Sequence, residues 1–257
     1  MEPIEPTFKQ IYFDKCQGFQ DSELSIIYDN LKDLVGIKDN SCFVEKSIRL
    51  YTNEGSFAYI INKYMRNFEK GLSYLSYYIG PLLYGLNKFI YDNPSFGLFK
   101  NFKLYRIIKC SKLDFYQYKI NLGHIICFPS FTSTSYEQIE FQPTDLSDKI
   151  NNNDNKNLLD VKLILDYSYK NGYISPGIII DNNKGHDSLP LSNYNEKEVL
   201  LFPFTFAKIN KIFSEEIKGV NFQVIIFEII GRKSYLEYKL KDDVQNRVLF
   251  SKLEKNK

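Results

Sequence analysis

The chain has 257 residues, with 33 Lys and Arg against 31 Asp and Glu, which gives a net charge of +2. This length can bury a sizeable core in one large domain, and the nearly balanced charge gives no indication of nucleic acid as a partner. No apolar run approaches the ~20 residues of a membrane span, and residues 1–6 lack the pattern of a secretory signal. The cysteines show no spacing typical of disulfide pairs or metal ligands. We therefore expect a cytoplasmic protein with reduced thiols.

Metal chemistry is not expected from this sequence. His124 and His186 lie far apart, and no cluster of Cys, His or Asp surrounds either of them. A zinc site would need about four such ligands at characteristic spacings. The sequence therefore predicts no metal cofactor.

Apolar residues at helical spacing dominate the first hundred residues. They predict an amphipathic helix over residues 21–34 that ends at Gly36, and a second over residues 53–68 that ends at Gly71. The same spacing continues through residues 72–91.

A proline divides this last stretch. Pro81 has no backbone N–H and cannot sit inside a helix without a kink, so we expect one helix to end there and a new one to begin at Gly80-Pro81. The aromatic residues of the second part, Tyr84, Phe89 and Tyr91, are expected in the core.

After Asn93-Pro94 the pattern changes to short runs rich in β-branched and aromatic residues, separated by polar turns. These predicted strands are residues 102–108, 124–135, 160–167, 177–181, 197–206, 222–230 and 235–240. Helices come first and strands later, without the regular alternation that a parallel sheet requires. The sequence therefore predicts an α+β protein with mostly antiparallel sheets.

Arg106 is a single guanidinium within the apolar strand pattern of residues 102–108. A buried arginine is costly unless an anion or a carboxylate pairs with it. Two interpretations stay open at this point, namely a phosphate-binding residue and a structural salt bridge. Further along, Ser133-Thr134-Ser135 closes another strand, and hydroxyl-rich strand ends of this kind are most often turn formers.

Glu196 and Glu198 stand where a polar loop becomes the apolar strand Val199 to Phe202. In an extended strand, side chains two apart share a face, so the two carboxylates would stand side by side. Either solvent screens them, or a positive group lies between them. Paired carboxylates also perform glycoside hydrolysis, which offers no account of Arg106.

Taken in order, these motifs resemble the Arg-Ser-Glu class of ADP-ribosyltransferases, specifically the arginine-directed mono-ADP-ribosyltransferases. The likeness runs from about residue 50 to residue 230. Its motifs are Leu50-Tyr51-Thr52 with Ile61-Asn62, Leu104-Tyr105-Arg106, the segment Phe128 to Ser135, and Glu196 to Pro203. The sequence departs from the family at Ile107, where a glycine is usual, and at Phe128, where tryptophan is frequent.

The resemblance implies an ADP-ribosyltransferase-like fold, with N-terminal helices packed on two mostly antiparallel β-sheets that form an NAD cleft. NAD would be a co-substrate, bound by Tyr105, Arg106, Ser133, Thr134, Ser135 and Glu198. Catalysis would rest on Arg106 at the pyrophosphate, on Ser133 at the nicotinamide ribose or at Glu198, on Glu198 beside the ribosyl cation, and on Glu196 at the acceptor guanidinium.

The function implied is transfer of ADP-ribose from NAD to arginine side chains of a partner protein, with release of nicotinamide. Residues 46–257 would form the catalytic domain, and residues 1–45 a helical extension of unclear role. Two alternatives are an NAD glycohydrolase on the same scaffold and a catalytically inactive domain that binds a partner protein.

Overall fold

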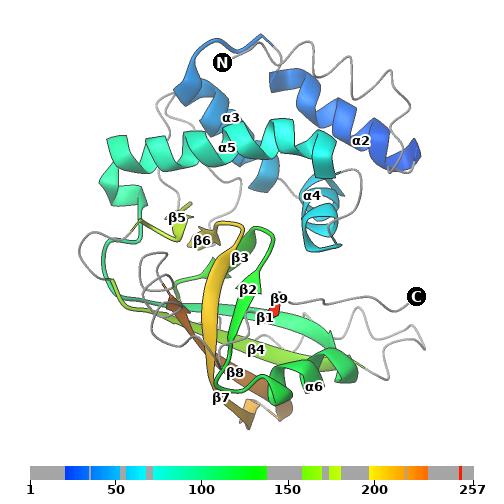
Figure 1. Cartoon of the computed structure of the whole chain (residues 1–257), viewed down its shortest axis with the longest axis vertical. Coiled ribbons are helices and arrows are strands. Elements are labelled where there is room, and N and C mark those ends of the chain that lie inside the picture. The colour runs from blue at the N-terminus through cyan, green and yellow to red at the C-terminus, as the bar shows by residue number, and fades with distance from the viewer. Residues whose placement is uncertain are drawn as a thin grey trace. The chain divides into compact units, whose positions relative to one another are not determined.

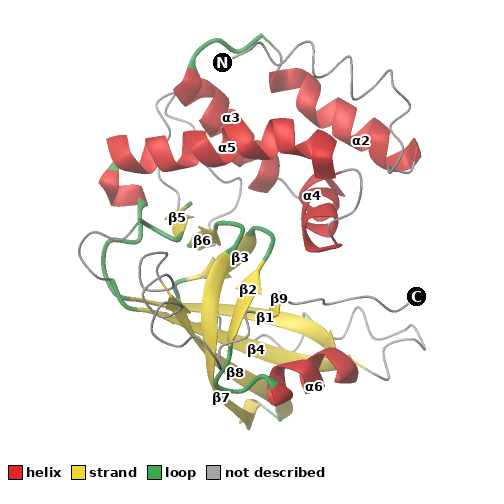
Figure 2. Cartoon of the chain, viewed as in Figure 1, coloured by secondary structure: helices red, strands yellow, loops and turns green. Residues whose placement is uncertain are grey.

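The order of the elements confirms the predicted α+β class. The protein is described here by a computed structural model for residues 21–34, 36–52, 56–67, 72–137, 158–169, 174–180, 197–217, 219–230 and 249–250. Among these residues, helices come first, and strands follow with a single helix, α6, among them (Figures 1 and 2). The chain divides into two compact units, of which one comprises Met1–Gly97, Ile178–Lys197 and Glu254–Lys257, and the other Leu98–Gly177 and Glu198–Leu253.

The described part of the first unit is built mainly from helices. They are α2 (Asp21–Leu31), η1 (Lys32–Leu34), α3 (Asn40–Thr52), α4 (Ser56–Asn67), α5 (Leu72–Asp92) and η2 (Pro94–Phe96). Gly36 has φ +80 just after η1, a conformation that glycine adopts without a steric penalty, so it ends the first helical segment as predicted. The predicted boundary at residue 45 falls within α3, and it stays a prediction.

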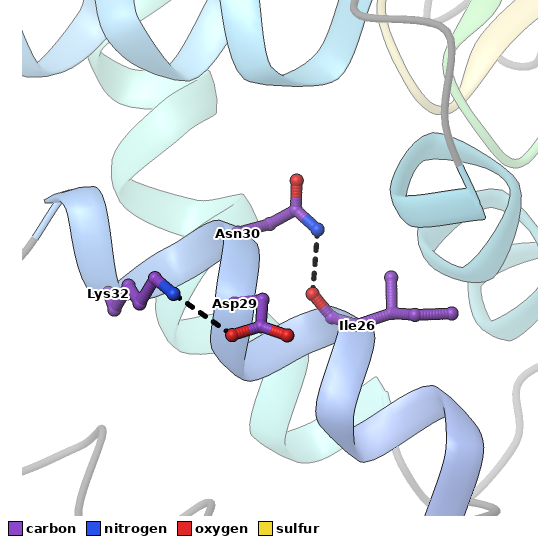
Figure 3. A network of polar contacts seen from close by, with 4 residues as sticks. All are labelled: Ile26, Asp29, Asn30 and Lys32. Atoms are coloured by element: carbon purple, nitrogen blue, oxygen red, sulfur yellow. Dashed lines mark hydrogen bonds and ion pairs between the residues drawn. The ribbon is translucent and has the colours of Figure 1, made fainter.

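Buried contacts, rather than surface polar contacts, hold α2. Figure 3 shows its polar contacts, in which the Asn30 side chain donates to the Ile26 carbonyl at 2.7 Å and Lys32 pairs with Asp29 at 3.0 Å. Both partners of that ion pair are at least half exposed, so the pair adds little to stability. Glu23 instead has a 2.6 Å hydrogen bond from the Tyr64 hydroxyl and a 2.9 Å contact with the Lys63 ammonium, which connects α2 to α4.

Helix α5 is continuous through Pro81, so the predicted break at Gly80-Pro81 is wrong. The buried side chains Leu75, Leu82 and Leu86 form one stripe on both sides of the proline, each at most 1 % exposed. Packing of this stripe outweighs the loss of one backbone hydrogen bond, since tertiary contacts supply most of a helix's stability in proteins. The predicted core position is correct for Phe89 but wrong for Tyr84 and Tyr91, which are 66 % and 83 % exposed.

The second unit contains most of the strands. They are β1 (Phe102–Ser111), β2 (Ile125–Phe128), β3 (Thr132–Ser135), β4 (Leu158–Tyr167), β6 (Glu198–Leu201), β7 (Thr205–Ile217), β8 (Val220–Ile230) and β9 (Leu249–Phe250), with α6 (Lys112–Ile120) after β1. The remaining described strand is β5 (Gly177–Ile179). Its first residue, Gly177, is assigned to the second unit, and its other two residues are assigned to the first. The predicted strand at residues 235–240 lies outside the described residues.

Hydrogen bonding joins these strands of the second unit in the order β6-β3-β1-β4-β8-β7-β2-β9. Most neighbours are antiparallel, as predicted, while β4–β8 and β2–β9 are parallel. The strands thus form one continuous sheet rather than two separate ones, because β1 pairs with both β3 and β4, and β8 with both β4 and β7. This order places β1, β3 and β6 side by side.

Aromatic contacts around Phe227 of β8 join α6 and β2 to the sheet. The Phe227 ring meets Tyr118 of α6 at 6.0 Å and Phe128 of β2 at 5.5 Å between centroids, both edge-on. Such edge-to-face pairs add to the free energy gained by burial. Phe128, where the resembled family frequently has tryptophan, is half-buried and packs edge-on against the buried Phe227.

Candidate active site

Arg106 stands on β1 and reaches across to the neighbouring strand β3. Its Nη1 donates a hydrogen bond to the backbone carbonyl of Ser133 at 2.7 Å, and the side chain is half-buried. The positive charge also acts on Tyr118. Burial raises the pKa of that phenol, and nearby Arg106 opposes part of the rise. The guanidinium is therefore a partly desolvated cation held beside β3, where a charge-assisted contact to an anion would be strong.

The Ser-Thr-Ser element forms the last three of the four residues of β3. Ser133 is exposed and Ser135 half-buried, while Thr134 between them is only 4 % exposed, as alternation along a strand requires. The Thr134 hydroxyl donates to the Val199 carbonyl at 2.8 Å, which couples β3 to β6 through a buried hydrogen bond. The two serines thus present hydroxyls on one face, while the threonine secures the strand.

Glu198 is the first residue of β6 and is half-buried. The three residues that follow it, Val199, Leu200 and Leu201, are at most 1 % exposed, so the strand behind the carboxylate is fixed in the core. Ser135 lies directly opposite Glu198 in the β3–β6 pairing, and Ser133 lies opposite Leu200. The hydroxyl residue next to Glu198 is therefore Ser135, whereas the prediction concerned Ser133.

Tyr105 completes a row across three strands, because it pairs with Ser135 on the other side of β3. Directly opposite residues in antiparallel strands share a face. Tyr105, Ser135 and Glu198 therefore project from the same face of the sheet, while Arg106, one residue further along β1, begins on the opposite face and reaches the main chain of Ser133.

The conformation of Lys197 changes the expectation for the two glutamates. Lys197 has φ 46, in the left-handed region that residues with a side chain rarely adopt. The side-by-side arrangement of Glu196 and Glu198 was derived from an extended strand, and that premise does not hold at Lys197, so the arrangement itself stays a prediction. Glu196 itself lies outside the described residues.

The structure thus brings together six of the seven predicted site residues on β1, β3 and β6: Tyr105, Arg106, Ser133, Thr134, Ser135 and Glu198. Sequence reasoning missed Gly177, where an added Cβ would lie 2.6 Å from the Leu200 carbonyl, so only glycine allows this close approach to β6. The Pro176-Gly177 pair is the signal that marks it.

Among the residues that the structure describes, no group of three or more His, Cys, Asp or Glu side chains has the arrangement of a metal site. None of the described helices is both long and apolar enough to span a bilayer.

Comparison with known proteins identifies the fold. The sequence matches no protein-family model, and no curated protein is similar to it in sequence. Among solved structures, it is similar to Vis, an ADP-ribosyltransferase of Vibrio splendidus, in its complex with agmatine, with 18% identity, a TM-score of 0.50, and coverage of 95% of this chain and 98% of that one. It is also similar to the ADP-ribosyltransferase HopU1 of Pseudomonas syringae pv. Tomato DC3000, with 14% identity, a TM-score of 0.51, and coverage of 88% of this chain and 96% of that one. The chain therefore has the ADP-ribosyltransferase fold.

Proposed function

We propose that this protein transfers ADP-ribose from NAD to arginine side chains of an acceptor protein and releases nicotinamide. The observation that carries the proposal is the pairing of β1, β3 and β6, which gathers Arg106, the two serines of β3 and Glu198 on adjacent strands of an ADP-ribosyltransferase fold. These groups come from positions that are far apart in the sequence, so their adjacency is a property of the fold.

Arg106 binds the pyrophosphate of NAD in this proposal. A half-buried guanidinium suits this role, because the lower local dielectric strengthens its attraction for phosphate and its planar fork matches two oxygens at once. Its 2.7 Å bond to the Ser133 carbonyl fixes the guanidinium before NAD arrives. The exposed Ser133 hydroxyl can then meet the nicotinamide ribose, with Tyr105 and Ser135 lining the same face.

Glu198 acts at the bond that breaks. When the bond between nicotinamide and ribose is cleaved, the electron pair leaves with nicotinamide and the ribose becomes an oxocarbenium-like cation. A carboxylate that is already in place stabilises this cation and accepts a hydrogen bond from the ribose 2′-hydroxyl. The buried residues of β6 behind Glu198 supply that fixed position.

Glu196 decides the acceptor in this proposal. A guanidinium keeps its proton up to a pH above 12 and is then a poor nucleophile, so a carboxylate must orient it and remove a proton as it attacks. Support for an arginine acceptor comes from the Vis structure, which was solved with agmatine, a small molecule that ends in a guanidinium group. Without such a carboxylate, water would take the ribosyl cation, and the enzyme would be an NAD glycohydrolase.

Two glutamate variants test these roles. Glu198→Gln should lower nicotinamide release by about 10²- to 10³-fold, because it removes the charge that stabilises the cation. Glu196→Gln should retain nicotinamide release and lose the labelling of agmatine by labelled NAD. Glu216→Gln, at an exposed carboxylate on β7, is the matched control and should behave as wild type.

Each outcome of this test has a distinct meaning. Wild type that releases nicotinamide without labelling agmatine would point to the glycohydrolase or to another acceptor. Equal labelling by Glu196→Gln and wild type would remove Glu196 from the acceptor role. Absence of both nicotinamide release and NAD binding by calorimetry would overturn the proposal in favour of an inactive, partner-binding domain.

A further inference from the structure

Helix α6 carries apolar side chains on two opposite faces. Phe115 and Tyr118 are buried at 4 % and 6 % exposure, and Tyr118 packs on Phe227 of the sheet. A second set faces away from this core and is at least half exposed, and we call it the α6 stripe: Leu113, Tyr116, Ile120 and, in the turn that follows, Leu122.

The helical spacing explains why the stripe is continuous. Leu113, Tyr116 and Ile120 are separated by three and then four residues, so their side chains lie on one face of the helix. Isolated exposed apolar residues are ordinary, but four large ones within ten positions of one surface segment form a patch, and such patches mark interaction sites. The core of the second unit does not need this face, because Phe115 and Tyr118 already anchor the helix.

The charges beside the stripe are positive. Lys112 and Lys119 are exposed on α6, and the Lys119 ammonium lies 4.9 Å from the centre of the Phe115 ring, between the buried and exposed faces. Asp114 is the only acidic residue of the helix. It is half-buried and accepts a hydrogen bond from the Ser111 hydroxyl at 2.6 Å, so it is held at the start of the helix, away from the stripe. The exposed face thus combines aliphatic and tyrosine side chains with lysine.

The size of the stripe favours a lipid surface over a protein partner. Four half-exposed side chains offer roughly 400 Å², about half of the ~800 Å² that each partner buries in a stable protein complex. A helix that exposes an apolar stripe beside lysines can instead meet a bilayer, where apolar side chains enter the headgroup region while the cations meet anionic lipids. Tyrosine also suits this position, since one end of its side chain is apolar and the other polar.

We propose that the α6 stripe binds the surface of an anionic lipid bilayer, with Leu113, Tyr116, Ile120 and Leu122 entering the interface and Lys112 and Lys119 contacting the headgroups. Because the stripe is short, the association is reversible and needs the apolar and the electrostatic contributions together. This binding does not depend on the proposed enzymatic function.

Vesicle flotation with the full chain tests the proposal. Wild type should float with phosphatidylcholine vesicles that contain phosphatidylserine, on the order of tenfold more than with phosphatidylcholine alone, and high salt should remove the difference. Leu113→Ser/Ile120→Ser should lose most of the binding, and Lys112→Gln/Lys119→Gln the preference for phosphatidylserine. The control is Tyr84→Ser/Tyr91→Ser, which removes two exposed aromatics of α5 and should bind as wild type.

The proposal is overturned if wild type does not float with anionic vesicles, or if Leu113→Ser/Ile120→Ser floats as well as wild type. Far-UV circular dichroism and thermal unfolding establish that each variant is folded, and the lysine variant keeps the apolar stripe in case the serine variant is unstable. A dimer in analytical ultracentrifugation that the serine variant abolishes, without vesicle binding by wild type, would instead assign the stripe to a second copy of the chain.

Discussion

The hydrogen bond between Arg106 and the Ser133 carbonyl makes Arg106→Lys a decisive substitution. Lysine keeps the charge but not the planar fork that reaches β3. A hydrogen bond to a charged group contributes about 1.5–3 kcal/mol to the free energy of unfolding. Because Arg106 is half-buried and lysine retains the charge, we expect the substitution to lower this free energy by about 1.5 kcal/mol, near the lower limit. For a chain of this size, that loss lowers Tm by about 3–6 °C. The functional loss should be larger, because the same guanidinium would also bind the pyrophosphate.

Two measurements separate these effects. Urea denaturation followed by circular dichroism gives the change in unfolding free energy, and release of nicotinamide from saturating and limiting NAD gives kcat and KM. The matched control is Lys103→Gln on the same strand, since among the described residues Lys103 forms an exposed, 3.7 Å ion pair with Asp166. Lower stability with unchanged NAD cleavage would make Arg106 a structural tether. If Arg106→Lys had the stability and the activity of wild type, both proposed roles of Arg106 would be refuted.

Three further predictions concern the surroundings of the site and the buried thiols. Thr134→Val removes the buried hydroxyl bond to β6 while keeping the side-chain shape, and should cost about 1–2 kcal/mol in urea denaturation at an unchanged m-value. Lys197→Val should cost about 1–3 kcal/mol because a β-branched residue resists the observed φ of 46, whereas Lys197→Gly should be tolerated; equal stability of the two variants would contradict the left-handed conformation. Burial raises the pKa of Cys110 and Cys127 to about 11, so both stay protonated at pH 8, and iodoacetamide should modify exposed Cys42 before either; peptide mass spectrometry of native and urea-treated protein checks this order.

Helix α6 shows where periodicity fails as a signal. Apolar residues at 113, 115, 116, 118 and 120 lie on two opposite faces of the helix, so no single helical stripe or strand alternation accounts for all five. The cause is the double use of this helix, which buries one face and exposes another apolar face. The same feature that hides α6 from sequence reasoning is the basis for the proposed lipid contact.

Strand β7 was largely missed, for a different reason. The predicted strand over residues 197–206 covers β6 and reaches only the first two residues of β7, Thr205 and Phe206. Strand β7 extends from Thr205 to Ile217, but its pairing with β8 shifts register between Ile209 and Lys211. Such a bulge inserts a residue and exchanges the two faces of the strand, so the alternation that would identify the strand is interrupted. The polar residues Ser214, Glu215 and Glu216 further conceal its second half.

Sequence reasoning predicted the strands that form the site, but not which of their residues stand opposite each other. The motifs around Arg106, Ser133 and Glu198 indicated three strands, and the structure makes these strands neighbours. Which residues stand opposite each other depends on register, and register depends on contacts between segments that are distant in sequence. The identification of Ser135 as the neighbour of Glu198 therefore required the structure.

We expect Glu196 and Glu198 to have different roles, and the reason begins in the backbone. Glu198 is the first residue of a strand whose next three residues are buried, and Thr134 bonds to the first of these, so the position of its backbone is fixed by the core. Lys197 has a left-handed conformation, so the strand's alternation does not extend beyond Glu198 toward Glu196. In the proposed function, Glu198 must meet a ribosyl cation at one fixed point, so rigid placement helps it. Glu196 would meet arginines of a separate acceptor protein and does not need the same rigidity. The change in backbone at Lys197 thus fits a division of labour between cleavage of NAD at Glu198 and selection of the acceptor at Glu196.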